Sequence, residues 1–563
     1  MTTTAPPASS GRMTHRQTIV ALSGLLLAMF AAFLSATIVS NALPTIISVL
    51  HGSQNQYTWI VTATLLSSTA TTPIWGKLSD LYSKKLLVQI STVIFTTGSL
   101  LAGFSPSVEM LIVWRSFQGL GLGGLQALVI IAIAAMISPR ERGRYMGPIA
   151  AVMSVAPVAG PLIGGVIVDT DWLGWRWCFW AGIPLAMVSL FVVHKTLHLP
   201  VMKRKVSIDW LGASLIVAGV CDLLIWVTLA GNDFAWGSGT SIAMLAGGLL
   251  LLGLAVVVEL RAAEPVIPLR LFRDRTTTLA TIGSLGVGVA MFGGAVFLIQ
   301  YFQIARGVSP TAAGLLMLPT IVGSTLGSTI SGALITRTGK LKVYLVVGSV
   351  LLLVGFAALA TIDHTTNMVL LGAYLFVMGA GTGTVMQNLV LAVQNVVPPT
   401  DLGSATSTVS FFRSLGGTVG VSVLGAVLAT QVADRIRAGL VATGADPAAA
   451  GSGDIGIGQL NELPGPLVEL VRIAYGDGTA RIFLVGTVLA VITLISVVFL
   501  KETPLRTQSG QEQLQDARRL EAAEAAGGTG GFAAEVAEEY AGLDQDQNRE
   551  RTGRHRAPEA AER

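Results

Sequence analysis

The chain has few charged residues. Only 12% of its 563 residues are Asp, Glu, Lys or Arg and 52% are hydrophobic, whereas an ordinary soluble domain is about one-quarter charged. This composition leaves too little polar surface to cover a water-soluble globule. Apolar segments recur along the chain instead, the first at 19–38 and the last at 480–500. Each is about 20 residues long, the length that crosses a bilayer as a helix. The sequence therefore predicts a multi-pass membrane protein.

The apolar segments also lack the alternation of polar and apolar residues that marks a membrane-spanning β-strand. Helices and closed barrels are the two structures that satisfy every backbone polar group in lipid, so we expect an all-α fold. Cysteine is scarce as well. The chain has two cysteines, Cys178 and Cys221, and both fall in apolar segments. We expect them to be reduced packing residues and not a disulfide.

The sequence lacks the residue patterns of an enzyme. The six histidines lie in predicted loops or tails, and no HExxH, GxSxG or GxxxxGKS/T pattern occurs. Gly119, Gly121 and Gly124 satisfy GxGxxG, but inside an apolar segment, where close packing of helices explains them better than a dinucleotide site does. We therefore expect no catalytic residue, metal ion, cofactor, ATPase subunit or nucleic-acid partner.

Segment lengths and turn-forming residues divide the chain into about fourteen spans. Lys and Arg are concentrated in the connections after spans two, four, six, eight and ten, and they are scarce in most connections on the other side. Because basic loops resist translocation, both termini are predicted to lie in the cytoplasm, with the protein in the inner (cytoplasmic) membrane.

A repeated turn predicts how the spans are grouped. Gly-x-Leu with nearby basic residues follows span two at 76–85 and span ten at 332–340, which indicates two six-span halves around two inserted spans. The predicted segments are a disordered cytoplasmic N-terminus (1–16), a first six-helix bundle (17–200), two inserted helices with flanking loops (201–275), a second six-helix bundle (276–500) with an outward loop (431–479), and a polar, mostly disordered cytoplasmic tail (501–563).

Four motifs carry a resemblance to a known family. They are GKLSDLYSKK at 76–85, RSFQGLG at 115–121, APVAGPLIGG at 156–165 and LSATIVSNALPTI at 34–46. On these motifs, residues 17–500 resemble the major facilitator superfamily, in its fourteen-span drug:proton antiporter branch. The resemblance implies a major facilitator fold, with two six-helix bundles plus two inserted helices, that works by alternating access.

The first motif places charged residues in the loop after span two. By the resemblance, this loop gates the inward face, and Asp80 forms a charge cluster with Lys84 and Lys85 and senses proton entry. Ser83 stands where the family pattern has a second glycine, so the turn must accept a side chain. An ordinary basic turn is the alternative interpretation, because basic loops are expected on this side anyway.

The second and third motifs lie within spans. The resemblance implies that Arg115, with Gln118, faces a cavity and takes part in proton transfer, and a charge inside the membrane is itself a sign of function. Snorkelling to the membrane surface is the alternative for Arg115. The third motif matches the pivot of antiporters, although a purely structural kink would look the same locally. Its residues are Gly160, Pro161, Gly164 and Gly165.

The fourth motif places Ser35 where the family keeps a membrane carboxylate. Thr37 and Asn41 lie on the same predicted helix, and we expect all three to border the substrate pathway. Other polar residues of the spans either line the pathway or hydrogen-bond between helices. These residues are Gln126, Gln300, Tyr301, Gln387, Asn388 and Arg413.

The core spans are nearly empty of carboxylates. A proton antiporter needs a group that titrates and changes its exposure, usually a carboxylate. Three are available, namely Asp80 at the inner gate, Glu109 at the outer end of span four, and Asp222 inside the inserted pair. Because a desolvated cation needs an anionic partner, this scarcity favours a neutral, amphipathic or anionic substrate.

The sequence thus predicts proton-driven multidrug efflux, the export of hydrophobic or amphipathic small molecules such as antibiotics, with antibiotic resistance as its consequence. The expected partners are the small-molecule substrate, protons and the lipid bilayer. One alternative is an exporter of a single metabolite, lipid or siderophore-like compound. The alternative from another class is a membrane scaffold or sensor that does not transport, which would need neither Arg115 nor the pivot.

Overall fold

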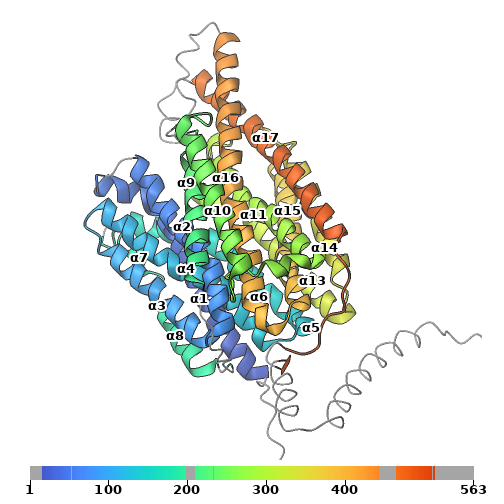
Figure 1. The fold of residues 1–563 in the computed structure, drawn as a ribbon. Coiled ribbons are helices and arrows are strands. Elements are labelled where there is room, and N and C mark those ends of the chain that lie inside the picture. Colours follow the sequence, from blue (N-terminus) through green and yellow to red (C-terminus); the bar gives the residue numbers. More distant parts are fainter. Residues whose placement is uncertain are drawn as a thin grey trace, which may run out of the picture. The chain divides into compact units, whose positions relative to one another are not determined.

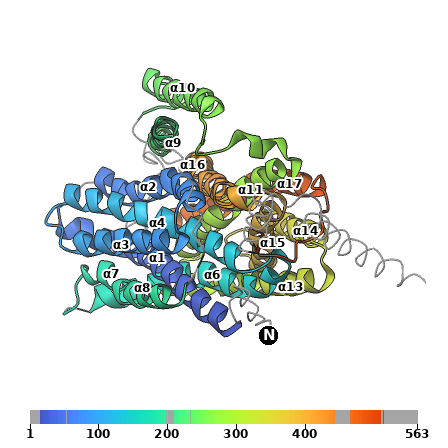
Figure 2. The ribbon, with the colours of Figure 1, turned by 60° about the horizontal axis from the view of Figure 1, so that its bottom comes forward.

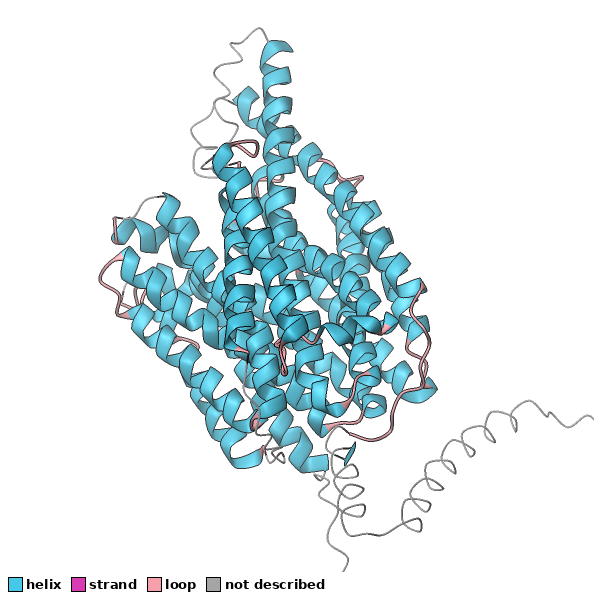
Figure 3. Cartoon of the chain, in the orientation of Figure 1, coloured by secondary structure: helices cyan, strands magenta, loops and turns pink. Residues whose placement is uncertain are grey.

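The computed structural model of the chain describes residues 15–51, 54–170, 172–197, 199, 209–231, 234–442, 465–509 and 512–513. Within these ranges every named element is a helix, which confirms the all-α prediction (Figure 3). The chain divides into two compact units, Met1–Ser509 and Gly510–Arg563. The disorder predicted for residues 1–14 and for most of the tail falls on residues outside the described ranges, whereas His15 and Arg16, also predicted to be disordered, begin the helix α1.

Twelve of the described helical segments are long and apolar enough to cross a membrane. Two further long helices, α2 (Gln54–Leu81) and α6 (Met146–Asp169), are 28 and 24 residues long. Together they match the fourteen predicted spans. α2 is less apolar because Thr62, Thr64, Ser68 and Thr69 on one of its sides line a cavity instead of facing lipid. The protein is therefore a helical, multi-pass membrane protein.

The helices fall into two halves and an inserted pair. The first half is α1 (His15–Val49), α2, α3 (Lys84–Gly103), α4 (Val108–Met136), α5 (Pro139–Arg142), η1 (Gly143–Tyr145), α6, α7 (Trp177–Trp180) and α8 (Ile183–Thr196). The inserted pair is α9 (Trp210–Leu229) and α10 (Gly239–Arg261). The second half is η2 (Leu269–Arg273), α11 (Arg275–Gln300), η3 (Tyr301–Ala305), α12 (Pro310–Leu316), α13 (Leu318–Thr338), α14 (Lys342–Leu359), α15 (Met368–Val396), η4 (Pro399–Asp401), α16 (Leu402–Ala442) and α17 (Gly465–Val498).

Packing contacts define each half and the seam between them. In the first half α1 packs on α6 and α8, and α4 packs on α2 and α3; in the second half α15 packs on α13 and α14, and α11 on α16 and α17. The halves meet where α16 packs on α2 and where α13 packs on α6. α9 and α10 lie side by side (Figure 2), with α9 against α2 and α16. The inserted pair therefore borders one seam.

The turn after α2 accepts its serine without strain. Ser83 has φ −61° and ψ 116°, and its hydroxyl oxygen accepts a hydrogen bond from the backbone N–H of Leu86 as the N-cap of α3. Serine is among the preferred N-cap residues, so the glycine of the family pattern is not needed here. Gly339, in the turn after α13, does adopt a left-handed φ of 68°, which glycine accepts without steric cost.

Both boundaries predicted for the outward loop, residues 431 and 479, are wrong. α16 continues to Ala442 and α17 begins at Gly465, and the connection between them, at 443–464, lies outside the described residues. With 41 residues, α16 is about 60 Å long, roughly twice the hydrocarbon thickness of a bilayer. Figure 1 shows its C-terminal end extending beyond the neighbouring helices, beside the start of α17.

Apolar spacing explains why these segments stay helical. Val432, Ile436 and Leu440 follow one another at intervals of four residues, which places them on one face of α16. All three are buried in the main hydrophobic core, as are Val471 and Ala474 of α17. The many small and polar residues between them, which suggested a loop, occupy the other faces of the two helices.

The polar tail starts later than the predicted boundary at residue 501. Leu505 is buried in the main hydrophobic core. The Nη1 of Arg506 donates a hydrogen bond to the carbonyl oxygen of Val397, just after α15, at 3.1 Å. The Glu502 carboxylate accepts one from the backbone N–H of Leu341, just before α14, at 2.8 Å. Residues 501–506 therefore belong to the second bundle.

Candidate functional site

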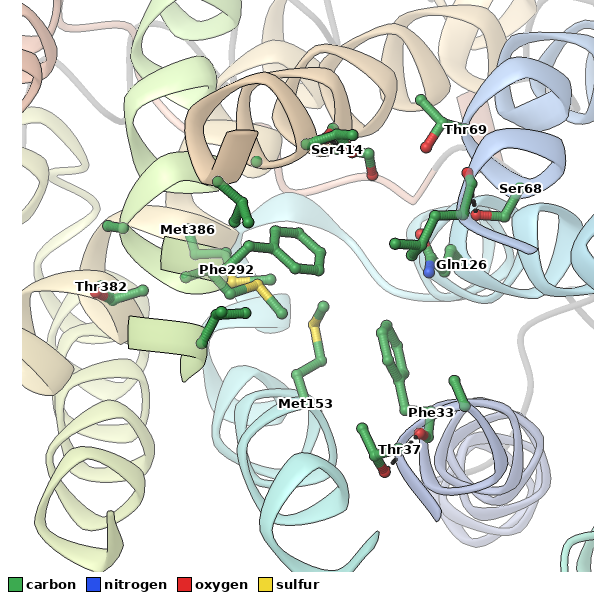
Figure 4. A pocket seen from close by; sticks show the side chains of 18 of the residues that line it. Phe33, Thr37, Ser68, Thr69, Gln126, Met153, Phe292, Thr382, Met386 and Ser414 are labelled. Atoms are coloured by element: carbon green, nitrogen blue, oxygen red, sulfur yellow. Dashed lines mark hydrogen bonds between the residues drawn. The ribbon is translucent and has the colours of Figure 1, made fainter. Parts of the chain in front are cut away.

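A cavity of about 540 Å³ lies between the two halves (Figure 4). Its walls come from α1, α2, α4 and α6 of the first half, from α11, α13, α15 and α16 of the second half, and from α9 of the inserted pair. The volume lies in the range of roughly 300–1,000 Å³ that small-molecule sites occupy. Both halves therefore border a cavity of the size that a small molecule needs.

The cavity lining is mostly apolar and adaptable. Phe33 and Phe292 present aromatic rings from opposite halves (Figure 4). Methionine side chains are unbranched and polarisable, so they adapt to ligands of different shapes. The lining methionines are Met153, Met291, Met317, Met378 and Met386. Hydroxyl groups such as those of Thr37, Ser68 and Ser414 supply hydrogen-bonding capacity (Figure 4).

Arg115 is the one charged residue among the described residues that line the cavity. It is the eighth residue of α4 and is 2% exposed, so its guanidinium is buried within the bundle. Its Nη1 donates to Gln118 Oε1 at 2.7 Å and its Nε donates to the carbonyl oxygen of Ile60 at 3.4 Å. These acceptors are neutral dipoles.

Gln118 connects Arg115 to the first helix. Its Nε2 donates to Ser99 Oγ at 2.6 Å and lies 3.4 Å from Ser35 Oγ. Ser35 is fully buried, at 0% exposed. The position where the family keeps a carboxylate is therefore linked through one amide to the cavity arginine. Within the described residues, no carboxylate forms an ion pair with Arg115, and the Gln118 amide oxygen accepts a hydrogen bond from it instead.

Asp80 joins the two halves at the basic end, which is the end of the bundle that carries Lys84, Arg140, Arg270 and Lys340. Its Oδ1 accepts from the backbone N–H of Gly403 at 2.7 Å. Its Oδ2 accepts from the backbone N–H and the hydroxyl of Ser404, at 2.8 and 2.7 Å. Asp80, at the end of α2, thus caps the start of α16, where a helix N-terminus favours negative charge.

The remaining residues of the first motif pack around this contact. Lys84 Nζ donates to the carbonyl oxygen of Ser79 at 3.0 Å, and Lys85 lies beside it in the first turn of α3. A Cβ at Gly76 would overlap the Oγ and Cβ of Ser407 and lie 2.8 Å from the carbonyl oxygen of Gly403. The glycine therefore lets α2 and α16 approach closely.

Arg142 makes a second connection between the halves at the basic end, one that the sequence did not single out. It is 2% exposed and donates through Nη1 to Gln394 Oε1 of α15. Its Nε and Nη2 hold the end of α4 through the carbonyl oxygens of Ile137, at 2.9 Å, and Ala134, at 2.7 Å. The available signal was a polar Gln394 near the basic end of an apolar span, facing an arginine-rich loop.

The pivot motif packs against α1. A Cβ at Gly160 would overlap Thr37 Oγ1, and one at Gly164 would lie 3.0 Å from the carbonyl oxygen of Ile38. Thr37 Oγ1 also donates to the carbonyl oxygen of Ala156 at 3.1 Å. These contacts bring α1 and α6 together, as small residues do in membrane helices. Asn41, Pro161 and Gly165 lie in these helices, but the surroundings of these three residues are outside the described part.

Some predicted pathway residues line the cavity and others do not. Gln126 and Gln387 line it. Asn388 instead donates to Ser331 Oγ at 3.2 Å and bonds α15 to α13. Tyr301 lies in η3, where its hydroxyl donates to the carbonyl oxygen of Asp363 at 2.6 Å. Gln300 ends α11, outside the lining.

Arg413 is buried away from the cavity lining. It is 5% exposed, and its Nη1 has no hydrogen-bond partner among the described residues. The backbone of α16 at this residue packs directly on Gly288 of α11, since a Cβ at Gly288 would overlap the Arg413 carbonyl oxygen. This arginine is therefore held within the second half.

None of the three predicted proton-binding carboxylates lines the cavity. Glu109 is in the first turn of α4, where its Oε1 accepts from Gln56 Nε2 at 2.7 Å. Asp222 faces α10, because a Cβ at Gly248 would lie 2.9 Å from its Oδ2. Neither residue is part of the cavity lining. Asp80 alone of the three connects the two halves.

Because Asp222 lies outside the cavity lining, its substitution is predicted to have a small effect on export. We expect Asp222→Asn to retain export within about twofold, the range typical of substitutions that remove no contact. Initial export rates of a fluorescent drug, normalised to the amount of folded protein, measure it. A loss of proton-dependent export in Asp222→Asn, with Gly253→Ala unaffected because a Cβ there meets nothing within 4 Å, would show that the inserted pair carries the coupling proton.

The chain is similar to known transporters along most of its length. The sequence profile of the Major Facilitator Superfamily matches residues 25–421. An uncharacterized MFS-type transporter of Mycobacterium tuberculosis is 36% identical over 86% of this chain and 70% of its own length. The multidrug transporter protein MdtP of Bacillus subtilis is 30% identical over 91% of this chain and 98% of its own.

A further relative and two solved structures are also named as pumps or transporters. The efflux pump dotC of Dothistroma septosporum is 32% identical over 87% of this chain and 84% of its own length. Among solved structures, the proton:xylose symporter XylE matches with a TM-score of 0.56 at 13% identity, covering 89% of this chain and 99% of its own. The human organic anion transporter MFSD10 matches with a TM-score of 0.53 at 15% identity, over 86% and 100%. At these identities the structures show a shared fold.

Proposed function

Because this chain belongs to the major facilitator superfamily, whose members are transporters and not enzymes, we propose that it exports hydrophobic or amphipathic small molecules by proton antiport. Export takes place by alternating access of the two halves around the cavity. The relatives named multidrug transporter and efflux pump support export as the direction. The basic loops support a cytoplasmic membrane location with both termini inside, so that the basic end faces the cytoplasm.

One observation carries the proposed mechanism. The cavity lies between two halves that are hydrogen-bonded to each other at the basic end through Asp80 and the start of α16. A closed gate at one end of a cavity between two halves is the arrangement that one state of an alternating-access transporter requires. Asp80 is the carboxylate whose exposure changes when this gate opens, so we assign proton sensing to it first.

The cavity chemistry supports the class of substrate. Its described lining holds one arginine and no carboxylate, so a desolvated cation would find no charged partner there, whereas a neutral or anionic molecule meets no such cost. The methionine and phenylalanine side chains accept varied apolar shapes. We therefore infer substrates that are neutral or carry negative charge beside an apolar body. Antibiotic resistance follows if drugs of this class are exported.

The proposal is tested by export from energised cells or vesicles, with and without an uncoupler. We expect wild-type export of a neutral drug to stop when the proton gradient collapses. Export that persists without the gradient would overturn antiport while leaving the family assignment intact.

Asp80→Asn tests the gate in the same assay. The amide keeps the shape of the carboxylate but loses the charge and one acceptor for Gly403 and Ser404, and charge-assisted bonds are roughly twice as strong as neutral ones. We expect export to slow about tenfold, in line with the ~1.5–3 kcal/mol of such a bond. Lys340→Gln, at the matching turn of the second half, is the control, and equal losses in both variants would argue against a specific gate at Asp80.

A further inference from the structure

The linker between α10 and α11, residues 262–274, is fixed in place as it crosses the basic end. Glu259, near the end of α10 and 5% exposed, accepts hydrogen bonds from the backbone N–H groups of Val266 at 3.0 Å and Ile267 at 3.2 Å. Val266 is buried, at 1% exposed, in a small apolar core with Ala70 of α2 and Phe411 of α16. The linker therefore sits where the two halves meet.

One end of the linker is bonded to the first half. Glu264 Oε2 lies 2.6 Å from the Nζ of Lys77, and the two side chains are 16% and 6% exposed. Lys77 precedes Asp80 by three residues on α2, which places the two on neighbouring positions of the helix surface. This shielded ion pair thus reaches α2 beside the gate.

The other end of the linker is bonded to the second half. Arg270 Nη2 lies 2.8 Å from Oδ1 and 3.0 Å from Oδ2 of Asp401. Asp401 ends η4, two residues before Gly403, which with Ser404 binds Asp80. Phe272 adds a ring contact to Phe412 of α16, with centroids 6.2 Å apart. The same linker is therefore anchored on both sides of the gate.

We propose that the linker is a clasp that holds the basic end shut, with Glu264 and Arg270 as its two positioning residues. The Lys77–Glu264 pair fastens it to the first half and the Arg270–Asp401 pair fastens it to the second. This gives the inserted helices a role in the transport cycle, since they deliver the clasp to the gate. The role of the clasp in transport rests on the proposed function, but its effect on the gate does not.

A clasp fastened at two ends has a distinctive energetic signature. The two ion pairs act in series, so the loss of either one releases the linker from one half and the loss of the second changes little more. Two independent surface ion pairs would instead give effects that multiply, because distant, uncoupled contacts contribute additively to free energy. The double variant therefore separates a clasp from two unrelated contacts.

A reporter for opening is available on α16. Ser410 is 1% exposed, and its Oγ has no hydrogen-bond partner among the described residues, so replacement by cysteine removes no bond. It lies seven residues after Gly403 and four before Ser414, on the face of the helix between the gate and the cavity. Ser410→Cys is introduced after Cys178→Ala and Cys221→Ala. Labelling by a membrane-impermeant maleimide is followed in inverted vesicles.

We expect Glu264→Gln and Arg270→Gln each to raise the labelling rate at position 410 about fivefold, as the loss of one modest ion pair allows. The double variant is expected to label about as fast as either single variant. The exchange of charges in Lys77→Glu with Glu264→Lys should restore the slow rate. Arg273→Gln, an exposed arginine of the same turn, is the control and should label at the parent rate.

Either of two results would overturn the clasp. One is a double variant whose acceleration is the product of the two single effects; the other is unchanged labelling in all three variants. Failure of the charge exchange to slow labelling, with folded protein confirmed by gel filtration, would also count against the specific pairing. Because labelling needs neither substrate nor a proton gradient, the clasp and the proposed antiport function succeed or fail separately.

Discussion

Arg115→Ala is expected to lower the initial rate of export of an anionic dye by about 100-fold, the size of effect that follows the loss of a buried charged contact. Arg115 supplies the one charge in the described cavity lining, and no carboxylate partner among the described residues competes with a substrate for it. Without the guanidinium, a desolvated anion meets only dipoles. The measurement is dye export from energised vesicles that contain equal amounts of folded protein.

Two comparisons make this result specific to charge. A neutral dye of similar size should lose only about tenfold, because Gln118 loses its partner and the wall of the cavity changes shape. Arg115→Lys should recover part of the anion export, since it keeps the charge but not the planar group that reaches Gln118 and Ile60. If Arg115→Ala exports both dyes at the wild-type rate, the arginine is a packing residue, and the inference that substrates are neutral or anionic is wrong.

Gly76→Val is expected to reduce export below detection, a loss of more than about 100-fold, by preventing closure of the basic end. Any side chain at Gly76 overlaps Ser407 and approaches the Gly403 carbonyl oxygen, and overpacking of such a contact forces the backbone apart. α2 and α16 would then separate, and Asp80 would lose Gly403 and Ser404. The valine variant should therefore label rapidly at a cysteine in position 410 while exporting nothing.

A second substitution should relieve the overlap at Gly76. Ser407→Gly removes the two nearest atoms that a side chain at Gly76 would meet, so Gly76→Ala with Ser407→Gly should regain part of the export that Gly76→Ala loses. Gly253→Val is the matched control, because a Cβ at this helical glycine of α10 meets nothing within 4 Å. Normal export by Gly76→Val would mean that the close approach of α2 and α16 is not needed in the cycle.

The fold was largely predictable because membrane helices are encoded locally. An apolar segment of sufficient length specifies a span whatever it packs against, and all fourteen were found. The ends of α16 and α17 were not, because they leave the lipid, where length and hydropathy no longer apply. There the deciding pattern is the spacing of Val432, Ile436 and Leu440, which a Gly-rich and Ala-rich neighbourhood obscured.

The site was only partly predictable, because its key contacts join residues far apart in the chain. The sequence pointed to Asp80 and Arg115 as charges in unusual places, but nothing local pairs Asp80 with Gly403, or Lys77 with Glu264. Gln387 and Asn388 show the same limit within one helix. They are adjacent in the sequence, yet one lines the cavity and the other bonds α15 to α13, since neighbouring residues point to different sides of a helix.

Arg115, the one arginine in the described lining of the cavity, also decides how the membrane potential acts on the proposed cycle. An empty cavity carries one fixed positive charge, whereas a cavity that holds a monoanion is neutral. A potential that is negative inside is worth about 2.3 kcal/mol per charge per 100 mV across the full membrane. It therefore favours the state in which the empty, positively charged cavity is open to the cytoplasm, and it has no such effect on the neutral, loaded cavity. The voltage would then drive the return step, and the export of an anion would speed up with membrane potential even at equal pH on both sides.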